Sequence, residues 1–388
     1  MVKDVISDRS KSVVRSGIRV MYDLALGKEG LVHLEIGEPD FPTPQHIVDA
    51  AKKALDEGYT QYTPNAGYLD LRESICRKLM ADNKIEADPK TEVIVTTGAM
   101  QAISSALLVT INPGDEVIIP DPAYESFVRQ TRFAGGIPVP VEVREEDEFR
   151  LKPEEVEKAI TNKTKMIIIN SPANPTGSVM HKDDLAGIAE LATDHDLLVL
   201  CDEIYEKMLY DGAQHHSIAT FPEMKDRVIT VFAFSKSYAM TGWRVGYAVG
   251  SKRIIGEMVK LQEFLVTCAT SIAQRATVAA LEGPQDGVSQ MVSEFKRRRD
   301  FMYDQITKIR GITCVKPKGA FYLYPNTSKT NLRQDDPAGD LLKKCGVVTA
   351  PGTAFGDHGK NYIRISLASS MENLKTAASR MQAELGKS

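Results

Sequence analysis

The sequence has no apolar run long enough to cross a membrane, and charge of neither sign dominates it. The longest apolar stretches, such as residues 166–169, have the length of a β-strand, whereas a spanning helix needs about 20 such residues. A formal net charge of −4 gives no electrostatic basis for binding nucleic acid or an anionic membrane surface. We therefore expect neither nucleic acid nor a membrane among the partners of this protein.

Cysteine is also scarce and unpatterned. The 388 residues include five widely separated cysteines with no C-x-x-C pair, namely Cys76, Cys201, Cys268, Cys314 and Cys345. Scattered cysteines are typical of reduced thiols in the cytoplasm, and the charged N-terminal segment has no apolar core of the kind found in a signal peptide. We interpret His215-His216 as a solvated loop. The sequence thus predicts a cytoplasmic protein without a metal site.

Length and patterning favour two domains. A chain of 388 residues exceeds what one simple core usually accommodates. Between about residues 45 and 285, short β-branched runs alternate with helix-period segments such as residues 182–195. The strand-like runs are residues 92–96, 116–119, 165–170, 197–201 and 227–232. Continuous apolar strands separated by helices indicate an α/β fold, with a mostly parallel sheet covered on both faces.

The pattern changes after the glycine and proline residues at 283–287. A long charged helix is predicted over residues 288–309, hairpin-like strands over 319–324, and a final helix from about residue 371. We therefore predict a large domain made of residues 46–285. A smaller domain combines residues 1–45 with residues 286–388.

The most informative stretch is residues 234–247, which follow a strand-like run. It holds Lys236, a preceding hydroxyl at Ser235 and, eight residues after the lysine, Arg244. A lysine amine attacks an aldehyde only when it is deprotonated, and an enclosed, cation-rich site favours that state. An arginine nearby can hold a phosphate, so the three residues suit pyridoxal phosphate. For an isolated lysine, the ordinary alternative is a surface Ser-Lys-Ser turn.

Other polar residues follow the ends of predicted strands, where open α/β sheets bind their ligands. Small residues at a helix start, 97–101, expose backbone N–H groups that suit a phosphate. Asp202 suits a pyridinium nitrogen, because a buried carboxylate is costly without a partner. Asn174 and Tyr205 are candidates for the phenolic oxygen of the cofactor. Tyr124 either stacks on the cofactor ring or packs as an ordinary aromatic side chain.

Together these segments resemble the aspartate-aminotransferase-like branch of the fold-type I pyridoxal-phosphate enzymes, over nearly the whole chain. Their order and spacing are more specific than any one of them. The resemblance is carried by residues 37–41, 43–44, 62–64, 67, 71–72, 98–99, 174–177, 202–205, 235–236, 242–244, 318–322, 351–352, 355–356 and 364–366. It implies a mostly parallel seven-stranded sheet in the large domain and a smaller α+β domain.

The resemblance also implies roles for single residues. Lys236 is expected to form the Schiff base with the cofactor and to move the substrate proton. The other implied cofactor contacts are Asp202 at the pyridinium nitrogen, Asn174 and Tyr205 at the phenolic oxygen, Tyr124 on the ring, and Ala99, Met100, Ser235 and Arg244 at the phosphate. Ala233 stands where some relatives have a polar residue, so part of the hold on the phosphate is expected to fall on Ser235.

Two further roles concern the substrate and the assembly. Arg364 resembles the arginine that binds the substrate α-carboxylate, with Gly37 and Asn174 nearby, and its planar fork suits a carboxylate. Tyr62 resembles a tyrosine that reaches the phosphate from a neighbouring subunit. The resemblance therefore implies a homodimer with shared active sites.

The substrate side chain is less well specified. Aspartate-preferring relatives often have a lysine in the phosphate turn, where this sequence has Met100. An apolar residue there favours aromatic or other apolar side chains, and residues 16–19 look most like those of archaeal-type aromatic or broad-range aminotransferases. We predict transfer from aromatic or broad-range L-amino acids to 2-oxoglutarate. The alternatives are an aspartate aminotransferase, in which a cation such as Arg19 reaches the pocket, and a carbon–sulfur β-lyase.

Overall fold

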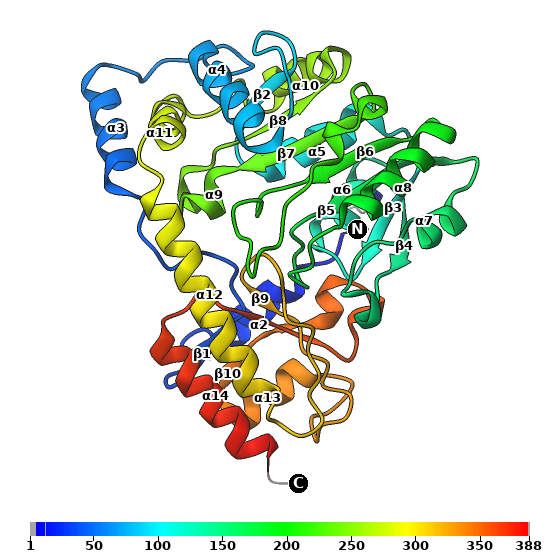
Figure 1. The fold of residues 1–388 in the computed structure, drawn as a ribbon, viewed down its shortest axis with the longest axis vertical. Helices are drawn as coiled ribbons and strands as arrows, with labels where there is room; N and C mark the ends of the chain where they lie inside the picture. Colours follow the sequence, from blue (N-terminus) through cyan, green and yellow to red (C-terminus); the bar gives the residue numbers. More distant parts are fainter. Residues whose placement is uncertain (1–4, 12, 387–388) are drawn as a thin grey trace.

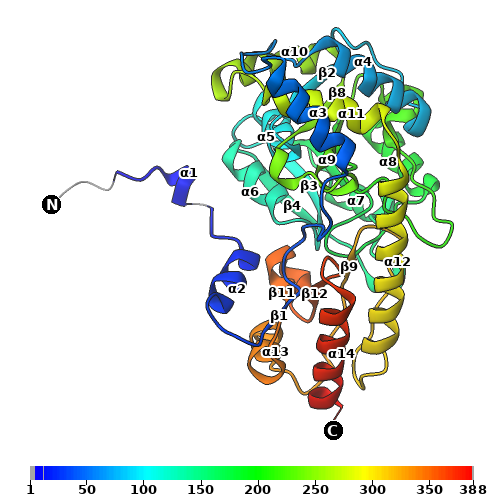
Figure 2. The ribbon, with the colours of Figure 1, turned by 90° about the vertical axis from the view of Figure 1, so that its left-hand side faces the viewer.

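A computed structural model describes residues 5–11 and 13–386 of the chain. The upper part in Figure 1 is a seven-stranded sheet covered by helices, and the lower part holds two small sheets with further helices. The long helix α12 (Asp286–Ile306) runs from one part into the other. The short helix α1 (Asp8–Lys11) buries no residue and stands away from the rest in Figure 2. None of the described helices is both long and apolar enough to cross a membrane.

The large sheet has the strand order β2-β8-β7-β6-β5-β3-β4, and only β8 runs against its neighbours. Its strands are β2 (Val93–Thr96), β3 (Glu116–Asp121), β4 (Ile137–Glu142), β5 (Thr164–Asn170), β6 (Leu198–Asp202), β7 (Val228–Ala233) and β8 (Gly246–Gly250). Nearly all side chains of β5, β6 and β7 are buried, as expected for strands with helices on both faces. The prediction of a mostly parallel seven-stranded sheet is confirmed.

The sequence patterns do not predict two strands of this sheet. β4 contains Pro138 and Pro140, which lack an N–H donor, and it lies at the sheet edge, where only β3 pairs with it. β8 begins and ends with glycine, a residue that strands disfavour. Local preference is weak in both segments, so their pairing partners determine that they become strands.

Helices cover both faces of the large sheet. α5, α6 and α10 pack on one face in a common core with residues of the strands, and α7 and α8 share a core with residues on the other. A third cluster joins α3, α4 and α11 to β2, β7 and β8. The helices are α3 (Gln45–Asp56), α4 (Leu69–Lys78), α5 (Ala99–Thr110), α6 (Ser126–Phe133), α7 (Pro153–Ala159), α8 (Lys182–Asp194), α10 (Lys252–Leu265) and α11 (Ser271–Glu282).

The lower part is built from both ends of the chain. β1 pairs with β10 in parallel, and β11, β12 and β9 form an antiparallel sheet. The elements are α2 (Gly17–Ala25), β1 (Val32–His33), β9 (Tyr322–Leu323), α13 (Pro337–Cys345), β10 (Val347–Val348), β11 (Ala350–Pro351), β12 (Ile363–Ser366) and α14 (Met371–Leu385). The predicted hairpin at residues 319–324 is wrong, because β9 pairs with the distant β12.

A single hydrophobic core unites the lower part. It joins Met21 and Leu34 to side chains of α12, α13 and α14, and it also includes Tyr205 from the segment after β6. The chain thereby brings the residues after β6 close to the β9–β12 sheet. The division into residues 46–285 on one side and residues 1–45 with 286–388 on the other stays a prediction.

Phe295 is the centre of an aromatic group in this core, and its removal should be costly. Its ring stacks on Phe321 at 4.8 Å and meets Phe41 edge to face at 5.4 Å, and none of its surface is exposed. Phe295→Ala should lower the free energy of unfolding by about 3–5 kcal/mol, measured by urea denaturation. Leu55→Ala, at a half-exposed position of α3, is the control and should change it by less than about 1 kcal/mol. Equal losses in the two variants would contradict the central place of Phe295 in the core.

Candidate active site

A cavity of about 500 Å³ lies at the carboxyl ends of β5, β6 and β7, where the sheet faces β9 and β12. Eleven of the twelve predicted site residues line it, namely Gly37, Ala99, Met100, Tyr124, Asn174, Asp202, Tyr205, Ser235, Lys236, Arg244 and Arg364. The exception is Tyr62, which is 85% exposed. Residues from seven separate stretches of the sequence thus line one cavity, and those that follow β5, β6 and β7 lie where the carboxyl ends of parallel strands meet.

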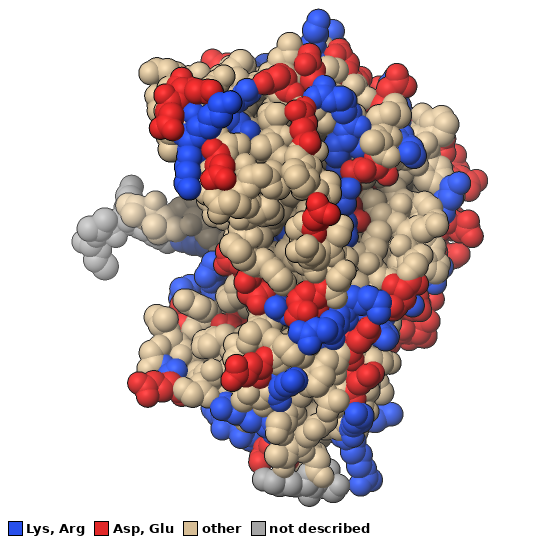
Figure 3. All heavy atoms as spheres, turned by 60° about the vertical axis from the view of Figure 1, so that its left-hand side comes forward, with Lys and Arg blue, Asp and Glu red and all other residues tan. Residues whose placement is uncertain are grey.

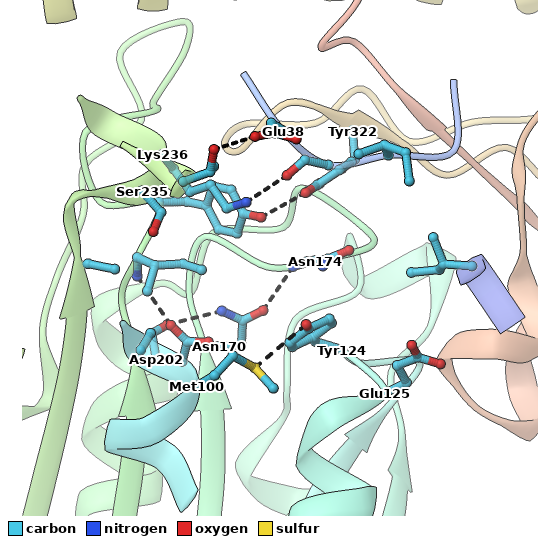
Figure 4. Close-up of a pocket in the computed structure, with 18 of the residues that line it drawn as sticks. Glu38, Met100, Tyr124, Glu125, Asn170, Asn174, Asp202, Ser235, Lys236 and Tyr322 are labelled. Atoms are coloured by element: carbon cyan, nitrogen blue, oxygen red, sulfur yellow. Dashed lines mark hydrogen bonds between the residues drawn. The ribbon is translucent and has the colours of Figure 1, made fainter. Parts of the chain in front are cut away.

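Lys236 lies in α9 (Phe234–Ser237), a single helical turn that begins directly after β7. Its Nζ donates a hydrogen bond to the carbonyl oxygen of Gly37 at 2.6 Å, and Figure 4 shows it pointing into the cavity. Burial, aided by the positive charges of Arg364 and Arg244, lowers the pKa of Lys236 to about 8. About a tenth of this amine is therefore uncharged, and hence nucleophilic, at pH 7.

Asp202 ends β6 and is only 1% exposed. Its carboxylate accepts one long hydrogen bond, from the backbone N–H of Ile204 at 3.3 Å, and has no ion pair within the part of the chain that the structure describes. Burial raises the pKa of Asp202 to about 7. A buried carboxylate with so little support is costly unless a ligand brings a positive charge or a proton donor.

Arg364 lies on β12 and is also buried, at 1% exposed. One guanidinium nitrogen donates to Asn174 Oδ1 at 3.0 Å and another to the carbonyl oxygen of Glu35, while the ring of Tyr322 lies 4.5 Å away. Its Nε is buried and has no hydrogen-bond partner among the described residues. One donor of the Arg364 guanidinium is therefore left unsatisfied within the described residues.

A pair of buried tyrosines also lines the cavity. The hydroxyl oxygens of Tyr205 and Tyr322 are 2.7 Å apart, and burial raises the pKa of both. Tyr322 also approaches Gly37 so closely that a Cβ there would lie 2.1 Å from the hydroxyl oxygen. Glycine at this position is thus a steric requirement of the site.

The opposite end of the cavity offers donors for a dianion. α5 begins at Ala99, and the first N–H groups of a helix have no partner within the helix. Arg244 adopts a left-handed backbone conformation with φ 52°, and its guanidinium lies so near Gly98 that a Cβ there would be 2.6 Å from it. Ser235 also lines the cavity. Non-glycine residues in this conformation are held there by their surroundings and occur often at functional sites.

Sequence reasoning assigned no role to several other lining residues. Tyr322, Glu38 and Asn170 belong to the motifs named above or adjoin them, but their orientation depends on tertiary contacts such as the bond from Thr241 to Glu38. Glu125 directly follows Tyr124 and binds Ser16 across the cavity mouth. No local pattern predicts that contact, because the two residues are 109 positions apart.

The expectation that His215 is solvated is wrong. Its side chain is 9% exposed, and its Nε2 lies 2.8 Å from an oxygen of Glu203. Glu203, Glu206 and His215 have ligand atoms close enough to hold a metal ion. However, Glu203 also accepts a hydrogen bond from Ser217 at 2.6 Å, and Glu206 forms an ion pair with Lys78. These partners already use the carboxylate oxygens, so we interpret the cluster as a buried hydrogen-bond network.

Comparison with known proteins agrees with this geometry. Residues 29–381 match the family model of aminotransferase class I and II. The chain is 44% identical to aromatic-amino-acid aminotransferase 2 of Thermococcus litoralis and 45% identical to aspartate aminotransferase of Pyrococcus abyssi, with 97% of each chain covered in both cases. The crystal structure of aromatic aminotransferase from Pyrococcus horikoshii OT3 matches with a TM-score of 0.89 and 44% identity, covering 95% of this chain and 99% of that one.

The chain belongs to the class I and II aminotransferases. The predicted family, fold type and enzyme class are thereby confirmed, as is the dependence on pyridoxal phosphate that this family implies. The substrates of such an aminotransferase are amino acids and 2-oxo acids.

The cavity of this aminotransferase fits the cofactor on independent grounds. The cofactor has a cationic ring nitrogen, an aldehyde and a phosphate, and the cavity holds a poorly supported buried carboxylate at Asp202 and an amine at Lys236. It also offers free helix N–H groups at Ala99 beside the guanidinium of Arg244. Each charged group of the ligand therefore finds a complement, which would satisfy a side chain that is otherwise poorly paired.

The pKa of Lys236 leads to a prediction for this aminotransferase. Attack on the cofactor aldehyde requires the uncharged amine, so the rate of cofactor incorporation into the cofactor-free protein should rise about tenfold per pH unit up to about pH 8 and then level off. Stopped-flow absorbance measures this rate. Arg364→Gln removes a neighbouring positive charge and should move the midpoint to higher pH. A midpoint near 10, the ordinary value for lysine, would contradict the assigned environment.

Proposed function

We propose that this aminotransferase moves the amino group of an aromatic or broad-range L-amino acid to 2-oxoglutarate by a ping-pong mechanism, in the cytoplasm. The observation that carries the proposal is the juxtaposition of Lys236, Asp202 and Arg364 around one cavity. The named activities of relatives at 44–45% identity, on aromatic amino acids and on aspartate, support the broad range. Met100 on the cavity wall favours apolar side chains over aspartate alone, because it supplies no charge there.

The position of each residue in the cavity determines its role in the reaction. Arg364 binds and orients the substrate α-carboxylate through its guanidinium, with Asn174 and the backbone of Gly37 beside it. Lys236 accepts the proton from the substrate Cα and returns it, which its lowered pKa permits near neutral pH.

Cofactor-holding residues form the rest of the assignment. Bound pyridoxal phosphate supplies an aldehyde for the amino group and an electron sink for the transfer. Asp202 would hold the ring nitrogen in its charged form, Asn174 and Tyr205 the phenolic oxygen, and Tyr124 the ring face. Ala99, Met100, Ser235 and Arg244 would hold the phosphate, the first two through backbone N–H groups.

We also propose that the active unit is a homodimer in which Tyr62 completes the partner's phosphate site. Tyr62 is 85% exposed and Phe264 is 80% exposed, and Leu265 and Val266 are exposed beside it. Their two segments lie together, since the N–H of Thr63 donates to Cys268 Sγ at 3.5 Å. Exposed apolar side chains gathered on neighbouring segments are typical of a protein interface. The face drawn in Figure 3 has basic and acidic side chains interspersed among uncharged residues.

A half-reaction screen tests the proposed function. Each amino acid is mixed with the holoenzyme, and the loss of its visible absorbance band is followed. Phenylalanine, tyrosine and glutamate should each bleach the band, and 2-oxoglutarate should restore it. Release of pyruvate from cystathionine at a comparable rate would instead favour a carbon–sulfur β-lyase. If aspartate were the only amino acid to react in a set that includes apolar, aromatic and acidic ones, the result would favour an aspartate aminotransferase.

Lys236→Ala should lower turnover by several orders of magnitude, because it removes both the attacking amine and the proton carrier. Equilibrium dialysis should show that the variant still binds the cofactor, since the phosphate and ring contacts remain. Lys207→Ala, at a lysine paired with Asp82 outside the cavity, is the matched control. Activity within tenfold of wild type in Lys236→Ala would refute the assigned role.

Arg364→Lys keeps the charge but loses the planar fork. It should weaken substrate binding by about 10- to 100-fold and lower the turnover number less, because the amine makes fewer directed bonds with a carboxylate. Steady-state kinetics with phenylalanine measures both effects. An unchanged KM would remove Arg364 from the substrate site.

A further inference from the structure

We propose that a recess of hydrogen-bond donors behind Met100 binds the distal carboxylate of five-carbon dicarboxylic substrates, while aromatic substrates rest on the methionine side chain. This inference rests on the proposed function and deepens it. It names Ser126 and Gln130, both on α6, as specificity-determining residues of the same site.

Three donors surround the sulfur atom of Met100. Its Sδ lies 3.4 Å from Ser126 Oγ, 3.6 Å from Gln130 Nε2 and 3.7 Å from the hydroxyl oxygen of Tyr124. Figure 4 shows the contact between Met100 and Tyr124 at the cavity wall. Gln130 Nε2 also donates to Ser126 Oγ at 2.7 Å, which leaves the Ser126 proton directed at the sulfur.

This arrangement leaves polar groups poorly satisfied. A thioether sulfur is a weak acceptor, yet Ser126 and Gln130 are buried, at 6% and 8% exposed. Buried donors aimed at a weak acceptor are costly, and a carboxylate oxygen would satisfy them far better.

Met100 is suited to cover and uncover the recess. It is 40% exposed and forms part of the cavity wall, whereas Ser126 and Gln130 lie behind it. The unbranched side chain changes rotamer easily and makes favourable contacts with aromatic rings. An aromatic substrate can therefore pack on the sulfur, and a distal carboxylate can displace it.

The charges around the recess indicate that neutral donors, rather than a cation, recognise the distal carboxylate of the substrate. Arg129 forms an ion pair with Glu125 at 2.9 Å and donates a hydrogen bond to the backbone oxygen of Val14. Arg19, the cation considered from the sequence, lies at the cavity mouth and is exposed, with its guanidinium 5.8 Å from the ring centre of Tyr22. A site without a fixed charge also avoids burying an unpaired cation when an aromatic substrate is bound.

The test uses holoenzyme and two unreactive ligands that both present one carboxylate to Arg364. Glutarate carries a distal carboxylate, and 3-phenylpropionate carries a phenyl ring. Dissociation constants come from the change in the visible spectrum on binding. Gln130→Met and Ser126→Ala should each weaken glutarate about tenfold, since a hydrogen bond to a charged group is lost, and should change 3-phenylpropionate by less than about twofold.

Further variants separate the recess from general effects. Ser105→Ala removes a buried hydroxyl of α5 that has no hydrogen-bond partner in the described parts of the chain, so it should leave both constants within about twofold. Met100→Ala should weaken 3-phenylpropionate and leave glutarate at least as tightly bound. The half-reaction with glutamate should slow in Gln130→Met, while that with phenylalanine should not.

Three outcomes would overturn the inference. They are an unchanged glutarate constant in both recess variants, an equal weakening of both ligands, and a selective loss of glutarate binding in Arg19→Ala alone. A wild-type protein that reacts with neither glutamate nor phenylalanine would contradict the proposed function instead.

Discussion

The site depends on holding three ionisable groups in one buried cavity without pairing them with one another. Within residues 5–11 and 13–386, Asp202 has no cation as a partner, Lys236 makes its hydrogen bond to a carbonyl oxygen, and Arg364 keeps a donor unused. Each arrangement is unfavourable for the protein by itself, because a buried charge is costly without a partner. The same arrangement favours a ligand that carries an anion, a cation and an electrophile in a fixed order.

Two separate parts of the fold, the large sheet and a small antiparallel sheet, produce this arrangement. The parallel strands β5, β6 and β7 end together and place Asn170, Asp202 and Lys236 at one edge of the large sheet. The short antiparallel sheet of β9 and β12 brings Tyr322 and Arg364 to face that edge. The cofactor end of the cavity thus belongs to a continuous rigid sheet, whereas the substrate end depends on how the lower part packs.

Much of this could be predicted from the sequence. The strands from β5 to β7 are continuous apolar runs, and the polar residues that end them stand at fixed offsets, so the edge of the sheet and its contents follow from local patterns. The resemblance over nearly the whole chain added Arg364 and Gly37, which lie far from the lysine in sequence. Residues such as Asp202 are identifiable because a carboxylate ending a buried strand requires an explanation.

Other features could not be predicted because they arise from contacts between distant segments. Because β4 contains prolines and β8 contains glycines, their sequences do not indicate strands, and pairing with neighbouring strands stabilises them. The short β9 pairs with β12 rather than with an adjacent strand. His215 is buried beside Glu203, and two of the three donors around Met100 come from a different helix, so no spacing along the chain signals either.

The identity of the amine that reacts with the cofactor is the most direct test of the proposed chemistry. Holoenzyme reduced with sodium borohydride, digested and mapped by mass spectrometry reports the modified residue. A single pyridoxyl group on Lys236 is the expected result. Modification of any other lysine, with Lys236 recovered unmodified, would contradict the assignment on which the site depends.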